Sequence, residues 1–274
     1  MTDTIRLRLE ISYDGAAFAG WAVQPGQRTV AGVLAEALHR ILGDPGAETP
    51  LGLTVAGRTD AGVHATGQVC HVDLPAARYA ELAGSLLRRL GGLMPGDARV
   101  KAIIPVPDTF DARFSATFRR YEYRVCDDPW GPDPLRRHDT LGWPRPLDLD
   151  RLNAAAIGLL GEHDFAAYCK RKEHATTIRA INQLDWRRDP DRTLVATVQA
   201  DAFCQAMVRS LVGAMIAVGE GRRGPEWPAT LLTLRERSNQ VTVAGAHGLT
   251  LVAVGYPAAD EYASRADATR RLRA

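Results

Sequence analysis

The sequence predicts an α+β protein built from two similar lobes. In each half, alternating and helical apolar patterns follow the same order of strand, helix, paired strands, helix and strand. The paired strands are consecutive, which favours mainly antiparallel sheets with helices on one face. We expect an N-terminal lobe over residues 1–114, a C-terminal lobe over residues 115–257, and a frayed Ala/Arg-rich tail over residues 258–274.

The first lobe opens with a half-buried strand. Residues 5–13 alternate between an apolar face and a charged face. Thr29 can cap a helix whose apolar spacing continues as far as Ile41 and stops at Gly43. Two strands, a second helix and a last strand follow, over residues 51–56, 68–74, 79–90 and 99–106.

The second lobe opens with residues 117–125, whose tyrosines and arginines fall on opposite faces of a strand. This pattern is common in a sheet with one solvated face; the functional alternative is a surface that stacks a base and grips phosphate. A proline-rich stretch between residues 129 and 146 predicts an irregular excursion. The remaining helices are expected over residues 148–160, 204–218 and 228–235, and the remaining strands over residues 178–186, 194–200 and 249–256.

Composition bounds the classes of protein. The 274 residues are 46% hydrophobic, which is enough for packed cores. Polar residues interrupt every long apolar segment, so we expect a cytoplasmic chain with no membrane association. The four cysteines lack CxxC spacing and are expected as buried, reduced thiols. The net charge of +2 gives no argument for a polyanionic partner. Arginine dominates the basic residues, which suits phosphate but would also follow from a bias in genome composition.

A polar loop between two predicted strands, residues 57–67, is the first candidate for chemistry. It contains Gly57-Arg58-Thr59-Asp60-Ala61-Gly62-Val63-His64. Glycines on both sides allow a tight backbone to present the single carboxylate of Asp60 to a cleft. An ordinary hairpin turn, with Asp60 bonded to its own backbone, is the alternative interpretation.

Arg209 is the second candidate, because it is the one charged residue between Asp201 and Glu220. A helix so apolar must be buried nearly all round, and an unpaired arginine there is costly. Its partner is either an acid of its own lobe, Asp201 or Glu220, or Asp60 across a cleft. In the second case the arginine keeps the carboxylate ionised by lowering a pKa that burial alone would raise.

Three blocks of sequence resemble the tRNA pseudouridine synthase A family. They are residues 57–64, 112–123 and 207–213, and their order and spacing match the family from about residue 5 to residue 257. The resemblance implies the pseudouridine synthase fold, with an active-site cleft between the lobes. It also implies a homodimeric isomerase, needing no cofactor and no metal, that converts uridine to pseudouridine at positions 38, 39 and 40 of the tRNA anticodon arm.

The resemblance also implies roles for single residues. Asp60 is the nucleophile, Arg209 its ionic partner, Tyr121 the ring stacked on the target base, and Leu249 an apolar wall of the pocket. Arg58 takes the space left by the flipped nucleotide. Contacts with the RNA backbone are expected from Arg78, Phe110, Asp111, Ala112, Arg113, Phe114, Lys170, Arg171 and Lys172. Without the resemblance, Tyr121 and Leu249 are interpreted as core residues.

The reaction requires residues of these types. Uracil must leave C1′ through N1 and rejoin it through C5, with no redox change and no hydrolysis. A carboxylate can attack the sugar or the base, or remove a sugar proton, and the sequence leaves these routes open. The target base must be extruded before the carboxylate can reach it, and an apolar pocket must exclude water.

Two other functions stay open. One is an RNA-binding protein or folding chaperone that keeps the fold without relying on catalysis. The other is a metal-dependent hydrolase that uses Asp60, His64 and His71, although no carboxylate or cysteine lies beside these histidines at ligand spacing. The chain departs from residues common in the family at Ala22, Ala31 and Gln205-Ala206, which bears on RNA contacts rather than on the reaction type.

Overall fold

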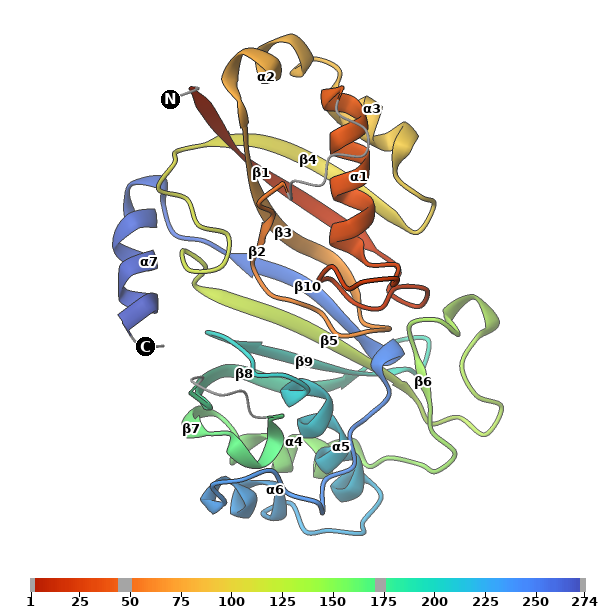
Figure 1. Ribbon diagram of the computed structural model, residues 1–274. Coiled ribbons are helices and arrows are strands. Elements are labelled where there is room, and N and C mark those ends of the chain that lie inside the picture. The colour runs from red at the N-terminus through yellow and green to blue at the C-terminus, as the bar shows by residue number, and fades with distance from the viewer. Residues whose placement is uncertain (1–2, 44–50, 171–175, 272–274) are drawn as a thin grey trace. The chain divides into compact units, whose positions relative to one another are not determined.

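The computed structural model describes residues 3–43, 51–170 and 176–271, and the chain divides into two compact units (Figure 1). Unit 1 holds Met1–Thr117 together with Ala253–Leu272, and unit 2 holds Phe118–Val252. The first boundary lies close to the expected one. The second differs, because strand β10, Leu249–Gly255, passes from unit 2 into unit 1 and the end of the chain belongs to unit 1.

Unit 1 contains an antiparallel sheet in the order β4-β1-β3. These strands span Ala98–Val106, Thr4–Tyr13 and His64–Pro75, and the short strand β2, Thr54–Val55, pairs with β3. The predicted alternation of β1 is confirmed, since Leu7, Leu9, Ile11 and Tyr13 are buried and the residues between them are not. The strand predicted over residues 51–56 is much shorter, and β3 begins at His64, so the loop before it is tighter than expected.

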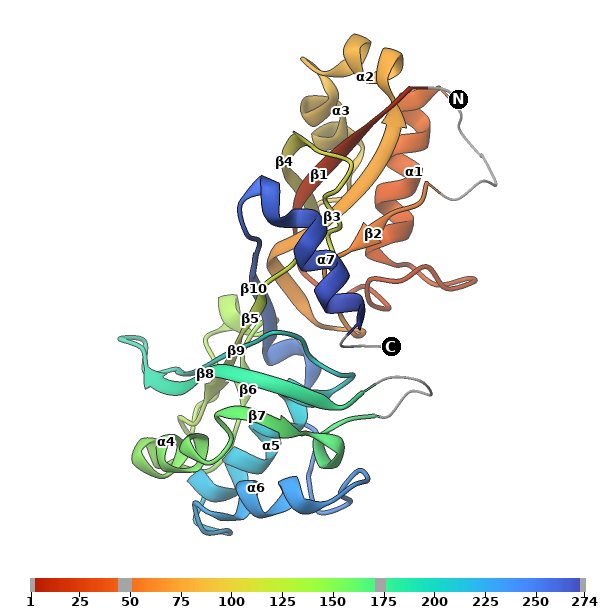
Figure 2. The ribbon, with the colours of Figure 1, turned by 90° about the vertical axis from the view of Figure 1, so that its left-hand side faces the viewer.

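The first helix of unit 1 follows its sequence signals. Helix α1 spans Val30–Leu42, and the hydroxyl of Thr29 accepts a hydrogen bond from the amide of Gly32. Gly43 ends the helix in the left-handed region at φ 84°. The apolar positions of α1 are buried beside the sheet, as Figures 1 and 2 show.

The helix predicted over residues 79–90 is instead two short helices. Helix α2 spans Ala76–Leu82 and helix α3 spans Leu86–Leu93. Between them the amide and the hydroxyl of Ser85 both donate to the carbonyl of Leu82. These bonds, next to the flexible Gly84, close a turn where a continuous helix would have passed.

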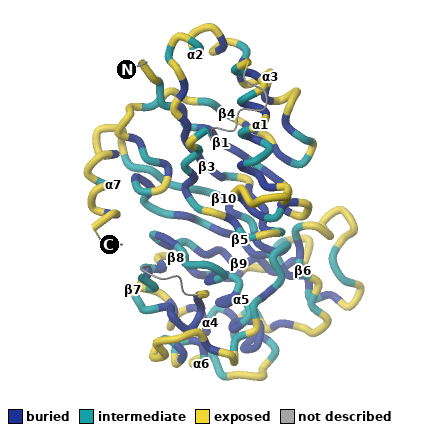
Figure 3. The backbone as a smooth tube through the Cα atoms, in the orientation of Figure 1, coloured by how far each residue is buried: buried dark blue, intermediate teal, exposed yellow. Residues whose placement is uncertain are grey.

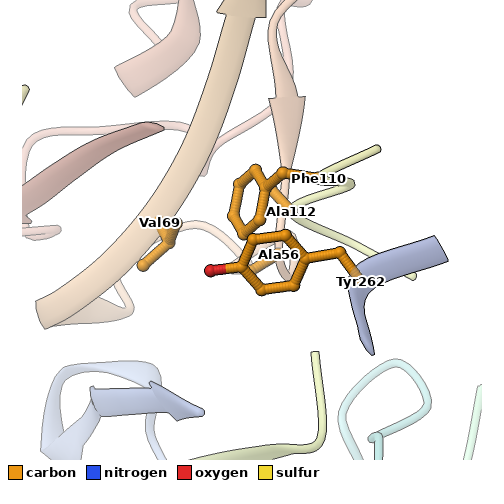
Figure 4. Packing of buried hydrophobic residues seen from close by; sticks show 5 residues of the cluster. All are labelled: Ala56, Val69, Phe110, Ala112 and Tyr262. Carbon is orange, nitrogen blue, oxygen red and sulfur yellow. The ribbon is translucent and has the colours of Figure 1, made fainter. Parts of the chain in front are cut away.

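The tail, expected to fray from residue 258, forms helix α7 over Tyr262–Arg271. Tyr262, Ala266 and Thr269 are buried at helical spacing, while the other side of α7 is exposed (Figure 3). The ring of Tyr262 packs edge-on against Phe110, with 5.0 Å between ring centres, in a cluster with Ala56, Val69 and Ala112 (Figure 4). This burial explains why residues 262–271 form a helix instead of a frayed end.

Unit 2 contains an antiparallel sheet in the order β5-β9-β8-β7. Strands β5, β8 and β9 confirm predictions, whereas β7 lies where no strand is predicted. Strand β5 spans Phe118–Cys126, β9 spans Leu194–Ala200, β8 spans Ile178–Arg188 and β7 spans Gly161–Asp164. The short strand β6, Leu141–Gly142, pairs in parallel with β5. On β5 the tyrosines face the buried side, as the alternation predicts.

The helices of unit 2 pack on one another and on its sheet. Helix α4 spans Leu149–Ile157, and the carboxylate of Asp148 accepts from the amides of its first turn. It packs against helix α5, Met207–Gly219, and against β8 (Figure 2). Helix α6 is short, Trp227–Thr230. The chain also forms 3₁₀ turns η1–η5 at Pro134–Arg136, Ala166–Tyr168, Leu231–Thr233, Ala246–Gly248 and Ala259–Glu261.

The cysteines differ in part from the prediction of four reduced thiols. Cys169 and Cys204, both in unit 2, are joined as a disulfide with their Cα atoms 5.7 Å apart. They are 35 residues apart in the sequence, so no local spacing signals the pair. Cys70 and Cys126 are free and buried, as predicted. Among the described residues, no helix has the length and apolarity needed to span a membrane.

Candidate active site

In unit 1, the loop that carries Asp60 is fixed by its backbone. The amide of Trp21 donates to the carbonyl of Thr59 over 3.1 Å, and the amide of Gly62 donates to Phe18 over 3.3 Å. The amide of Val63 donates to the carbonyl of Asp60 over 3.2 Å, closing a turn. Asp60 itself is partly buried.

Two glycines let the segment before helix α1 approach this loop. A Cβ atom on Gly15 would lie 2.0 Å from the carbonyl oxygen of Val63, so no side chain fits there. Gly20 has a φ of 97°, and a Cβ atom on it would lie 2.7 Å from the carbonyl oxygen of Thr59. Backbone therefore packs directly on backbone on both sides of Asp60.

A buried polar cluster lies under the same loop. The side-chain amide of Gln68 donates to the carbonyl of Gly57 over 2.9 Å and to the hydroxyl of Tyr13 over 3.1 Å. The hydroxyls of Tyr13 and Thr59 are 2.8 Å apart. Burial raises the pKa of Tyr13 to about 12, so its hydroxyl stays protonated.

The two histidines considered as metal ligands, His64 and His71, bind backbone. The Nδ1 atom of His64 accepts from the amide of Gly15 over 2.9 Å, and that of His71 accepts from the amide of Ala112 over 3.0 Å. Burial lowers the pKa of His71, and the charge of Arg6 lowers it further. The described part of the chain has no group of three or more His, Cys, Asp or Glu residues suited to a metal ion. The Nδ1 atom of His64 also lies 3.1 Å from a carboxylate oxygen of Asp14.

The expected RNA-contacting residues of unit 1 differ in how far they are buried. Arg58 is exposed in the Asp60 loop. Arg78 lies in helix α2 and is partly buried; its side chain pairs with Glu81 and donates to the carbonyl of Ile41, near the end of helix α1. Phe110 and Ala112 are fully buried, so their side chains belong to the core rather than to an RNA surface.

The rest of the 110–114 segment stays at the surface. The carboxylate of Asp111 accepts from the amides of Arg113 and Phe114, which fixes the turn. The guanidinium groups of Arg113 and Arg270 lie 4.9 Å and 5.0 Å from the centre of the Phe114 ring. Arg270 also pairs with Asp111, so helix α7 supports this turn.

In unit 2, Arg209 is held by the segment that leads to Leu249. Its Nε atom donates to the carbonyl of Ala244 over 2.7 Å, and the amide of Ala244 donates to the carbonyl of Arg209 over 3.0 Å. A Cβ atom on Gly213, one turn further along helix α5, would lie 1.7 Å from the carbonyl oxygen of Thr242. Helix α5 therefore packs backbone to backbone on this segment.

Tyr123 of strand β5 contacts the same segment. Its hydroxyl donates to the carbonyl of Gly245 over 2.7 Å, and its ring would lie 2.7 Å from a Cβ atom on Gly248. Burial raises the pKa of Tyr123, against the opposing charge of Arg209. Tyr121, two residues earlier on the same face, packs edge-on against Phe203 with 5.2 Å between ring centres. Arg209 and Tyr123 thus both bind the segment that leads to Leu249.

One partner considered for Arg209 is excluded by helix geometry. Glu220 caps the far end of α5, about 16 Å along the axis from Arg209 at 1.5 Å per residue. Its carboxylate instead binds Trp143, Arg145 and Arg222.

The basic segment at residues 170–172 is only partly described. Lys170 is exposed, and its backbone amide donates to the carbonyl of Gln205 over 3.0 Å. Arg171 and Lys172 lie outside the described residues. Ala206, at the departure from the family pattern, precedes helix α5 with a φ of 64°, a conformation disfavoured for a residue with a Cβ atom.

The comparisons with known proteins cover the whole chain. A protein of Frankia casuarinae named tRNA pseudouridine synthase A is 57% identical over 274 residues, covering 100% of this chain and 97% of that protein. The chain belongs to the tRNA pseudouridine synthase A family. Proteins of the same name from Streptomyces griseus and Mycobacterium leprae are 54% and 49% identical, over 98% and 100% of this chain and 94% and 97% of theirs.

Two further similarities are shorter or weaker than these family matches. A family model described as tRNA pseudouridine synthase matches residues 155–257, which lie largely in unit 2. A solved structure titled "Crystal structure of the archaeal box H/ACA sRNP Nop10-Cbf5 complex" aligns with 77% of this chain and 44% of that chain. Its TM-score is 0.33 at 12% identity, too low to support an argument.

Sequence reasoning about this family member missed several residues beside the site. Tyr13 and Gln68 look like ordinary strand residues, and the signal available for Gln68 was an amide among apolar neighbours on a buried strand. Phe203 follows strand β9 directly, yet nothing in its spacing indicates that it packs on Tyr121.

Proposed function

We propose that this chain isomerises uridine to pseudouridine in tRNA, at positions 38, 39 and 40 of the anticodon stem-loop, with Asp60 as the nucleophile. The chain is a tRNA pseudouridine synthase. The observation that carries this conclusion is 57% identity along the full chain to a protein of that name. The positions in tRNA and the role of Asp60 rest on the family motifs at residues 57–64, 112–123 and 207–213.

Asp60 suits the role of nucleophile because its loop is held on both sides. Hydrogen bonds fix the backbone at Gly57, Thr59 and Gly62, so unit 1 itself holds the main chain on both sides of Asp60. A preorganised group loses little freedom when the substrate arrives, which lowers the barrier to reaction.

The residues of unit 2 supply the complementary parts. We infer that Arg209 is the ionic partner of Asp60 and that Tyr121 stacks on the target uracil, with Leu249 as an apolar wall. The support comes from within the unit: Arg209 is held at Nε by Ala244, and Tyr121 and Leu249 are 7% and 5% exposed. An arginine beside a carboxylate keeps it ionised, and apolar walls exclude the water that would hydrolyse the detached sugar.

The reaction leaves the composition of the nucleotide unchanged, since one proton is lost and one is gained. The bond from C1′ to N1 breaks, a bond from C1′ to C5 forms, the C5 proton passes to solvent, and N1 takes up a proton. Asp60 serves either by attacking the sugar or the base or by removing a sugar proton. The chemistry at this site needs acid–base and nucleophilic groups, which Asp60 supplies, and the proposal assigns no step to a cofactor or a metal.

RNA contacts are proposed for the predicted set apart from the buried Phe110 and Ala112. Arg58 fills the space of the flipped nucleotide, and Arg78, Asp111, Arg113, Phe114 and the 170–172 segment hold the backbone. The arginines beside the Phe114 ring support this assignment, since arginine and aromatic faces together suit nucleic acid. We also propose that the enzyme is a homodimer and acts in the cytoplasm.

The site of modification can be tested with synthetic RNA. An unmodified tRNA transcript with uridines at positions 38 to 40 is treated with the protein, and pseudouridine is mapped by carbodiimide labelling and primer extension. We expect stops in the anticodon arm, which vanish in a transcript carrying cytidines at those three positions. Pseudouridine at other positions alone would overturn the assigned target site.

A further inference from the structure

The Asp60 loop rests on a buried chain of three polar side chains, Gln68, Tyr13 and Thr59. We propose that this chain positions Asp60 for catalysis, so that Tyr13, Gln68 and Thr59 are positioning residues of the enzyme. The inference rests on the proposed function of Asp60. It concerns unit 1 alone, since all four residues belong to that unit.

One side-chain amide links the members of this hydrogen-bonded cluster. The side-chain nitrogen of Gln68 can only donate, and it donates to the hydroxyl of Tyr13 and to the carbonyl of Gly57. The oxygen of Tyr13 therefore accepts from Gln68. The hydroxyls of Tyr13 and Thr59 share a second hydrogen bond over 2.8 Å, in which either hydroxyl can be the donor. Gln68 is thus connected to Thr59 through Tyr13.

The hydrogen bonds of this polar cluster end at Gly57 and Thr59, the residues on either side of Arg58. Gln68 holds Gly57 directly and holds Thr59 through Tyr13. The amide of Trp21 binds the carbonyl of Thr59, so this residue is fixed by both its side chain and its backbone. A shift of Thr59 must therefore move the next residue, Asp60.

The sheet is irregular at this point, and the irregularity aims Tyr13 at the loop. Ile11 pairs with Gln68 across strands β1 and β3, whereas Tyr13 pairs with Ala65, so the register changes between Ile11 and Tyr13. Such irregularities redirect side chains and are common beside active sites. They let Tyr13 reach Thr59 while its ring packs on Phe18 and Trp21.

The three side chains of this hydrogen-bonded cluster are buried. Gln68 is 0% exposed, Tyr13 4% and Thr59 6%. Buried hydrogen bonds hold their geometry better than exposed ones, because no water competes for the donors and acceptors. Removing one member leaves its partners unsatisfied in the interior, which favours a small movement of the loop.

The test compares paired substitutions that differ by one polar group. Tyr13→Phe removes the hydroxyl and keeps the ring, Thr59→Val removes Oγ1 and keeps the shape, and Thr59→Ser keeps Oγ1. Val72→Ala is the control for lost stability alone. Val72 lies on strand β3, as Gln68 does, and is 1% exposed. We measure kcat and KM with the tRNA transcript, tRNA affinity by filter binding, and the melting temperature of each variant.

We expect Tyr13→Phe and Thr59→Val to lower kcat about 10- to 100-fold, as small misplacements of a reacting group do, with KM and tRNA affinity within about two-fold of the parent. Thr59→Ser should recover most of kcat, and Val72→Ala should keep it despite a lower melting temperature. Parental kcat in both Tyr13→Phe and Thr59→Val would overturn the proposal. So would an equal loss of kcat in Val72→Ala, or a loss confined to KM.

The remaining outcomes are also decisive. If Tyr13→Phe does not fold, the comparison of Thr59→Val with Thr59→Ser decides alone. Asp60→Asn is assayed alongside: if it keeps the parental kcat, the proposed function of Asp60 fails. If it is inactive while Tyr13→Phe and Thr59→Val are fully active, only the positioning role fails.

Discussion

Arg209 and Ala244 bind each other twice, through the Nε–H of the arginine and the carbonyl of Ala244, and through the amide of Ala244 and the carbonyl of Arg209. The arginine is therefore oriented by the segment that continues into Leu249. This relationship links the proposed ionic partner of the nucleophile to the proposed wall of the base pocket, within one unit. A substitution in either part should therefore change the position of the other.

Arg209→Lys keeps the positive charge but has no Nε–H for Ala244. A hydrogen bond from a charged donor contributes about 1.5–3 kcal/mol, so we expect kcat to fall by roughly 10- to 150-fold. Arg209→Ala should fall at least as far. Single-turnover rates measure this, with the exposed Arg137→Lys as a control. Equal rates for Arg209→Lys and the parent would show that only charge is required.

Gly213→Ala should destabilise unit 2. The new Cβ atom would lie 1.7 Å from the carbonyl oxygen of Thr242, and the overpacking should cost about 1–3 kcal/mol, more than the helix propensity gained. Gly92→Ala in helix α3 meets no atom within 4 Å and should instead stabilise the protein by up to about 1 kcal/mol. Urea unfolding measures both changes, and a stabilising Gly213→Ala would refute the close packing.

His71 should make the protein less stable at mildly acidic pH. Burial, aided by Arg6, lowers its pKa in the folded state, so below about pH 6.5 the unfolded chain binds a proton that the folded chain does not. The contribution of His71 is complete above that pH and is lost as the pH falls toward the folded pKa. We expect the free energy of unfolding to drop less between pH 7.5 and pH 5.5 in His71→Gln. The same drop in both proteins would contradict this role.

The disulfide between Cys169 and Cys204 predicts a thiol count. Denatured, unreduced protein should show the thiols of Cys70 and Cys126 only, and reduction should expose all four cysteines. Reduction should also lower the free energy of unfolding by about 2–4 kcal/mol. Thiol titration with a chromogenic disulfide measures the count. Four thiols in unreduced protein would show that the bond does not form in solution.

The sequence predicted the elements that carry strong periodic patterns. Strands β1, β5, β8 and β9 and helix α1 have long amphipathic or apolar runs. Helix α1 also has clear ends, the cap at Thr29 and the left-handed Gly43. The break between helices α2 and α3 has a weaker signal, because Gly84 and Ser85 are tolerated in helices and only tertiary packing decides.

Long-range partners account for what sequence reasoning missed. Helix α7 is ordered because Tyr262 reaches Phe110, a residue far away in the chain, and this contact also buries Phe110 itself. Gln68 meets Tyr13 only through the pairing of β1 with β3. Family motifs located the candidate residues Asp60 and Arg209, but the bonds that hold them depend on segments with no motif of their own.

The central claim is that Asp60 drives the isomerisation of uridine in tRNA. The most direct test measures tritium release from a tRNA transcript labelled at C5 of uracil, with the parent protein and Asp60→Asn at equal tRNA occupancy and in chelator. We predict stoichiometric release by the parent and none above background by Asp60→Asn. Binding of the transcript by both proteins with release by neither would contradict the claim and favour an RNA-binding protein, and equal release by both would remove Asp60 from the mechanism.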